Sequence, residues 1–150
     1  MDIGKDYIGV SVVYFCYDGA GRFLMAKRSD NARDERGKWD IGGGKIEPHD
    51  TVIDSLQREV QEEYCADILD HQFLGYRDAH RTLPDGTPTH WIALDFAVKV
   101  DPDTVAIGEP HKFTDLQWFT LDTKPSEAEM HSQLPLFFTQ YNQDLARYAA

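Results

Sequence analysis

The sequence predicts an α/β fold in which a mixed β-sheet lies between helices. Runs rich in β-branched and aromatic residues alternate with turn signals along most of the chain. One segment in the middle, and a second at the C-terminal end, instead carry apolar residues at helical spacing. Strands mixed with two amphipathic helices predict a layered fold, because each helix must bury its apolar face against the sheet.

The first part of the chain predicts a hairpin and a short strand. Residues 7–17 and 22–28 are rich in apolar β-formers, and the Asp-Gly-Ala-Gly turn at residues 18–21 separates them. Residues 29–38 are polar and predict a loop, and residues 39–41 predict a short strand that leads into three glycines. We interpret the glycines as a close backbone bend, with a plain tight turn as the alternative.

The last part of the chain predicts three more strands and a helix. Residues 68–81 predict a long, bent strand that ends in the turn signal of residues 83–86, followed by strands at residues 90–100 and 115–120. A helical pattern covers residues 127–149, with Pro135 as an alternative start. Its core-facing residues are predicted to be Leu136, Phe137, Tyr141, Leu145 and Tyr148.

The central helix, predicted at residues 51–64, carries acidic residues beside its apolar stripe. Asp50 or Thr51 can cap its start, and the stripe is formed by Val52, Ile53, Leu56, Val60 and Tyr64. At roughly 100° per residue, Glu63 projects within about 20° of Leu56. Glu59 lies at the edge of the stripe, and Glu62 lies about one residue-step further round.

Carboxylates gathered beside a buried surface repel one another and lose hydration, which is costly unless a cation or a proton compensates. Oxygen ligands from one helix suit a hard ion such as Mg²⁺ or Mn²⁺. The competing interpretation is a solvated charged face, which predicts the glutamates opposite the stripe with Lys or Arg four residues away. The arrangement of Glu59 and Glu63 favours the metal site.

The segment from Gly44 to Ala66 resembles the signature of the Nudix hydrolase family, which is G, five residues, E, seven residues and then R-E-U-x-E-E-x-G-U, with U a bulky aliphatic residue. The run Arg58-Glu59-Val60-Gln61-Glu62-Glu63 matches it with the spacing kept over 23 residues. Three positions depart: Asp50 replaces the first glutamate, Cys65 replaces a glycine, and Ala66 is a small aliphatic residue. The resemblance implies a Nudix-type α/β/α sandwich.

The resemblance also implies an activity, in which water attacks a phosphorus atom in the pyrophosphate link of a nucleoside diphosphate derivative. The derivative would be a nucleoside triphosphate or a nucleotide sugar. It implies that Glu59, Glu62 and Glu63 hold Mg²⁺ or Mn²⁺ and that Gly43 or Gly44 adds a carbonyl oxygen. Which acid is the general base stays open.

A further acid is implied after the sheet, with Glu109 as the first choice and Asp115 or His111 as alternatives. We expect Arg58 to brace the glutamates through charge-assisted hydrogen bonds rather than to contact substrate.

Substrate phosphates could be held by Lys27, Arg28 or Lys45, for each of which a solvated surface charge is the alternative. Arg77 and Arg81 are weaker candidates. Four aromatic residues could stack on a base, although core positions are the commoner role of such residues; they are Tyr7, Trp39, Trp118 and Phe138.

Composition limits the alternatives. At 150 residues and 41% hydrophobic content, residues 1–150 predict one domain. The net charge of −11 disfavours a nucleic-acid polymer as partner, and any phosphorylated substrate would need metal to approach the acids. We expect no membrane span and a cytoplasmic protein. Cys16 and Cys65 predict packing thiols, the six histidines show no metal-ligand spacing, and a homodimer would be common for this kind of protein.

Two other functions stay open. One is a catalytically weak Nudix-fold module that binds a nucleotide as a sensor, which the departures at Asp50 and Cys65 allow. The other is an isomerase acting on an isoprenoid diphosphate, which is disfavoured because neither Cys16 in a strand nor Cys65 at a helix end is placed as the necessary acid. A P-loop is excluded because Trp39 and Ile46 occupy its first glycine and its hydroxyl position.

Overall fold

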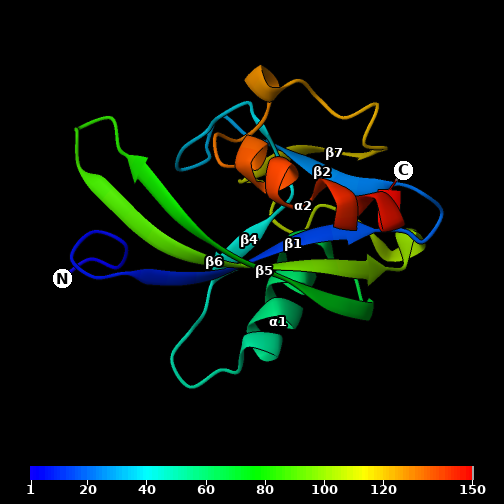
Figure 1. The fold of residues 1–150 in the computed structure, drawn as a ribbon, viewed down its shortest axis with the longest axis horizontal. Coiled ribbons are helices and arrows are strands. Elements are labelled where there is room, and N and C mark those ends of the chain that lie inside the picture. Colours follow the sequence, from blue (N-terminus) through cyan, green and yellow to red (C-terminus); the bar gives the residue numbers. More distant parts are fainter. Residues whose placement is uncertain (150) are drawn as a thin grey trace.

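A computed structural model describes residues 1–149 and contains a seven-stranded sheet with one α-helix on each face (Figure 1). Helix α1 (Val52–Tyr64) covers one face and helix α2 (Leu134–Ala149) covers the other. The predicted α/β sandwich is therefore confirmed. Ala150, the last residue of the predicted domain, lies outside the described residues.

The sheet is mixed because β1 and β6 run parallel, whereas the other pairs are antiparallel. The strands form the path β3-β2-β1-β6-β5, to which β4 is added beside β1 and β7 beside β2. Their bounds are β1 Gly9–Tyr17, β2 Phe23–Arg28, β3 Trp39–Asp40, β4 Gly43–Lys45, β5 Ile68–Thr82, β6 Pro88–Val100 and β7 Phe113–Phe119.

Two hydrophobic clusters hold the layers together. Since side chains alternate along a strand, Val12 and Tyr14 of β1 face α1, where they pack with Leu56 and Val60. Phe15 faces α2 with residues such as Phe137, Tyr141 and Leu145. The acidic residues of α1 therefore border one core, and α2 closes the other.

Three local expectations were wrong. Residues 43–45 form the strand β4 rather than a turn, since β4 pairs with Ser11–Val13 and the bend is confined to Gly42 at φ +107°. Leu136 is 61% exposed, because it lies on the face of α2 opposite the buried Tyr141 and Leu145. The segment before α2 is a short 3₁₀ helix, Glu127–Glu129, rather than part of it.

The ends of α1 explain one departure from the family signature. The Thr51 side chain caps the helix by accepting a hydrogen bond from the Asp54 N–H at 3.0 Å. Cys65 follows the last turn in the left-handed conformation at φ +55°, which a glycine adopts at lower cost. The helix thus ends in a left-handed residue, as a glycine at this position would allow, although the residue here is cysteine.

Strands β5 and β6 extend past the rest of the sheet as a long hairpin arm (Figure 1). A turn between Leu83 and Thr87 closes it, with Gly86 at φ +87°. Alternation places Arg77, Ala79 and Arg81 on the α2 side of the arm. In residues 1–149, neither helix has the length and apolar composition of a membrane span.

Candidate active site

The three glutamates of α1 differ in their surroundings. Glu63 is 3% exposed; its carboxylate accepts hydrogen bonds from the Tyr14 hydroxyl and, at 3.3 Å, from the Gly43 N–H. The Glu59 side chain is 13% exposed, and that of Glu62 is 52% exposed. Glu63 and Glu59 therefore turn inward, as the helical wheel predicts, and Glu62 lies at the rim.

Arg58 lies among the acids. Its guanidinium is bonded to Asp50 and lies 3.5 Å from a Glu59 oxygen and 3.9 Å from a Glu62 oxygen. These contacts fit the expected bracing role. They also explain how the shorter Asp50 can stand at the first acidic position of the signature, because its partner is the long side chain of Arg58.

The electrostatics of the acids favour a cation. Burial raises the pKa of Glu63 to about 8, and burial together with the charge of Glu62 raises the pKa of Glu59 above its usual range. Both carboxylates are therefore costly as unpaired anions. A set of oxygen donors of this kind fits a hard divalent ion, which would offset that cost.

The glycines of β4 allow the acids to approach the backbone. A Cβ atom on Gly44 would lie 2.1 Å from Cδ of Glu59, so only glycine leaves room for this carboxylate. The Gly43 N–H contacts Glu63. Strand β4 thus meets the inner glutamates, at the place where the resemblance expects a backbone ligand.

The loop before β7 brings Glu109 to the same region. The Gly108 N–H donates to the Glu63 carbonyl at 2.9 Å, and the Glu109 carboxylate pairs with Lys112 at 3.3 Å. Lys112 and Glu109 both influence the pKa of Glu63, in opposite directions, so both lie within electrostatic reach. Of the two alternatives, Asp115 bonds Gln117 on β7 and His111 is exposed.

The ligand oxygens are not drawn together to metal-binding distance. Within residues 1–149, one group of three acidic or histidine side chains has its ligand atoms within 4.8 Å of one another. It consists of Asp78, His80 and His90 and does not include the α1 glutamates. Arg58 holds Glu59 and Glu62, while Tyr14 holds Glu63.

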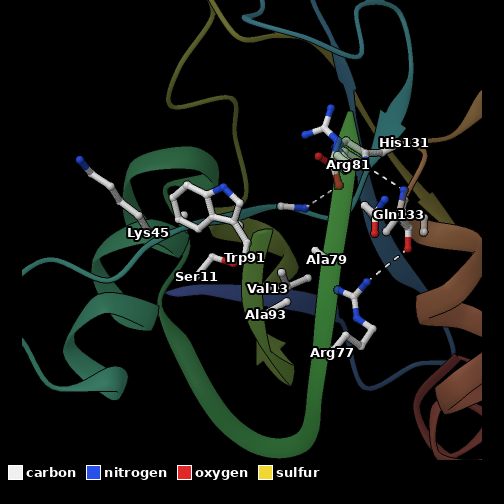
Figure 2. Close-up of a pocket in the computed structure, with 15 residues that line it drawn as sticks. Ser11, Val13, Lys45, Arg77, Ala79, Arg81, Trp91, Ala93, His131 and Gln133 are labelled. Atoms are coloured by element: carbon white, nitrogen blue, oxygen red, sulfur yellow. Dashed lines mark hydrogen bonds between the residues drawn. The ribbon is translucent and has the colours of Figure 1, made fainter. Parts of the chain in front are cut away.

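A cavity of about 270 Å³ opens on the α2 side of β4 (Figure 2). Gly42, Gly43, Gly44 and Lys45 form one wall, so β4 separates this cavity from the inner glutamates. The arm supplies Arg77, Ala79, Arg81, Trp91 and Ala93, and His131 and Gln133 close the third side.

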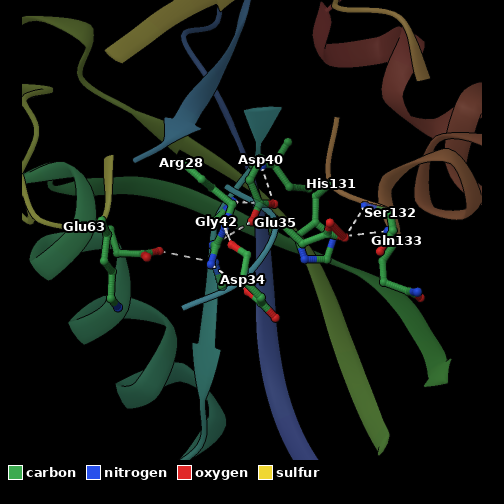
Figure 3. Close-up of polar contacts among 12 residues, drawn as sticks. Arg28, Asp34, Glu35, Asp40, Gly42, Glu63, His131, Ser132 and Gln133 are labelled. Atoms are coloured by element: carbon green, nitrogen blue, oxygen red, sulfur yellow. Dashed lines mark hydrogen bonds and ion pairs between the residues drawn. The ribbon is translucent and has the colours of Figure 1, made fainter. Parts of the chain in front are cut away.

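The predicted phosphate-binding residues do not all lie at the cavity. Lys45 lines the cavity, Lys27 is exposed and lies outside its lining, and Arg28 is bonded to Asp34 at 2.9 Å and paired with Asp40 at 3.5 Å. Arg81 binds the other Asp34 oxygen at 2.8 Å. Figure 3 shows Arg28, Asp34 and Asp40 gathered together, with Glu63 apart from them on the side of α1.

Arg77 belongs to a buried ionic cluster. It binds both oxygens of Asp95, at 2.7 and 2.8 Å, and donates to the Gln133 carbonyl at 3.2 Å. The Tyr141 hydroxyl donates to Asp95 at 2.7 Å. The cluster ties the arm to α2. This cluster was missed from the sequence, because the only sign of it there is Asp95, an isolated charge inside an apolar strand.

The aromatic residue beside the cavity is Trp91. Gly4 and Gly9 lie against its indole, where a Cβ atom would come within 2.2 and 2.5 Å. The four predicted stacking residues are not among those that the structure places around this cavity. Trp91 could have been found by alternation in the strand predicted at residues 90–100.

The sequence matches the NUDIX domain family over residues 8–138. The chain therefore belongs to the Nudix family, and it is a hydrolase of pyrophosphate bonds, as the motif predicts.

Relatives and solved structures agree with this family. A protein of Enterobacter sp. (strain 638), called nucleoside triphosphatase NudI, is 29% identical over 126 residues, which cover 80% of this chain and 87% of that protein. NudI of Salmonella agona is 40% identical over 49 residues, covering 33% of this chain and 35% of that protein. A MutT NUDIX hydrolase from Burkholderia pseudomallei superposes with a TM-score of 0.76 at 24% identity, covering 90% and 98% of the two chains, and shows the same fold.

Proposed function

We propose that this chain hydrolyses the pyrophosphate linkage of a nucleoside diphosphate derivative, a nucleoside triphosphate or a nucleotide sugar, with Mg²⁺ or Mn²⁺ as cofactor. The observation that carries the proposal is the buried pair Glu59 and Glu63 against the glycines of β4, in the family's signature spacing. The name of the NudI relatives favours a nucleoside triphosphate among these substrates.

In this proposal the metal is held by Glu59, Glu62, Glu63 and Glu109 with a carbonyl oxygen of Gly43 or Gly44. A bound divalent cation would neutralise the phosphate oxygens. Arg58 orients the acids through Asp50, Glu59 and Glu62.

The cavity next to β4 would take the nucleoside. Trp91 offers an aromatic face for a base, and Lys45 offers a charge for phosphate, while Lys27 and Arg28 are the remaining phosphate candidates. We also propose that residues 1–150 form one domain that works in the cytoplasm on a small nucleotide.

One observation favours a second function, that of a weakly catalytic nucleotide sensor. Arg58 already neutralises part of the acidic cluster, since it contacts Asp50, Glu59 and Glu62. The NUDIX domain of Shewanella oneidensis NrtR, solved with ADP ribose, has a similar fold at 14% identity and a TM-score of 0.71 over 93% of this chain and 90% of that one.

The test is release of phosphate or pyrophosphate from a panel of nucleoside triphosphates and nucleotide sugars with Mg²⁺. Glu62→Gln and Glu63→Gln should each lower turnover by on the order of a hundredfold or more with the fold intact. Gln57, which is exposed on α1, provides a control: Gln57→Ala should leave turnover unchanged. Full activity in either glutamine variant would refute the assignment, and tight nucleotide binding without turnover in the wild type would establish the sensor.

A further inference from the structure

Three potential metal ligands meet on the α1 side of the hairpin arm, opposite the face that lines the cavity. Asp78 and His80 lie two residues apart on β5, and His90 is the cross-strand partner of His80 on β6. Their ligand atoms lie within 4.8 Å of one another. The histidines show no metal-ligand spacing along the sequence, but strand register brings together two of them that lie ten positions apart.

The backbone geometry explains why these side chains are close. The His90 N–H donates to the Gly4 carbonyl at 2.8 Å, so it points away from β5. His80 and His90 are thus a non-hydrogen-bonded antiparallel pair, in which side chains approach most closely. Their rings stack with centroids 4.2 Å apart, and His90 Nε2 lies 2.8 Å from Asp78 Oδ1.

We propose that Asp78, His80 and His90 form a second metal site, selective for a borderline divalent transition ion of the Zn²⁺ class. Two imidazole nitrogens and one carboxylate suit such an ion, whereas the oxygen-only donors of α1 suit Mg²⁺. The ligands are exposed or half-buried, so an ion can enter and water can complete its coordination.

The proposed site joins β5 to β6 at the pair His80–His90. The last pair of the arm, Thr82–Pro88, lies two residue pairs further on. The intervening residue on each strand, Arg81 and Thr89, belongs to the opposite face, and Arg81 lines the cavity with Trp91. A bound ion would therefore brace the two strands that carry one wall of the cavity, without touching the glutamates of α1.

The experiment is calorimetric titration of the untagged full chain with Zn²⁺, in excess Mg²⁺ so that the hard site does not compete. One Zn²⁺ should bind per chain, and His80→Ala and His90→Ala should each weaken binding by about tenfold or more. His71→Ala, an exposed histidine on the same strand, is the matched control and should bind as the wild type does. Glu63→Gln should also keep Zn²⁺ binding.

A second measurement is the melting temperature. At a hundredfold excess over the wild-type Kd, Zn²⁺ should raise the wild-type Tm by about 5–10 °C and should raise the Tm of His90→Ala by about half as much or less. Equal Zn²⁺ affinity in the wild type and both histidine variants would overturn the proposal. Loss of Zn²⁺ binding in Glu63→Gln would also overturn it, because the ion would then occupy the glutamates.

Discussion

Replacing Asp95 by asparagine should destabilise the protein strongly. Asp95 is fully buried. Among the ion pairs of residues 1–149, it is the only carboxylate that pairs with the Arg77 guanidinium. The substitution leaves a buried cation without its counter-charge, which costs about 3–5 kcal/mol. For a chain of this size that corresponds to a Tm lower by roughly 6–20 °C.

Urea denaturation followed by circular dichroism measures the change. Asp70→Asn, an exposed carboxylate on β5, is the control and should change stability by about 0.5 kcal/mol or less. Replacing both partners, Arg77→Met with Asp95→Leu, should restore most of the loss, since no buried charge then remains. A loss below about 1 kcal/mol for Asp95→Asn would show that Arg77 is solvated and the reasoning wrong.

Two further predictions concern the acids. Gly44→Ala should displace the Glu59 carboxylate and lower turnover about tenfold or more with little change in Tm, because the displaced group is the end of a flexible side chain; unchanged turnover would contradict this. Burial alone would raise the pKa of Asp34, but hydrogen bonding to Arg81 and the charges of Arg81 and Arg28 outweigh it and lower that pKa. Because the pKa of Asp34 is lower in the folded protein, its ionised carboxylate stabilises the fold at pH values above 3.8, its usual pKa. This stabilisation is lost as the pH falls through the pKa of Asp34 in the folded protein. Arg81→Met should therefore cost up to about 1 kcal/mol at pH 7, and the difference from the wild type should shrink under acid conditions; a difference that grows with acidity would contradict it.

The fold was predictable wherever one periodicity dominated. The apolar run of β6 predicts a strand, and the apolar stripe of α1 identifies the buried face of the helix, each without knowledge of the rest of the chain. Strand β4 was not predictable, because Gly43 and Gly44 have low strand propensity and pair only through the backbone of β1. Leu136 could have been excluded from the core by helical spacing alone, because at roughly 100° per residue it lies on the side of α2 opposite Leu145.

The candidate site was predictable where its residues are close in sequence. Glu59 and Glu63 belong to one helix, so the wheel alone orients them. The cavity residues Arg81 and Trp91, and the pair His80 and His90, depend on the register of two strands joined by a turn, which a single sequence does not specify.

The central claim is that the inward acids of α1 bind a divalent cation. Titration of the untagged His90→Ala chain with Mn²⁺, followed by electron paramagnetic resonance of the free ion, tests it without interference from the arm. The account predicts that Mn²⁺ binds, that Mg²⁺ displaces it, and that adding Glu63→Gln weakens binding by about tenfold or more. Absence of Mn²⁺ binding, or equal binding with and without Glu63→Gln, would contradict it.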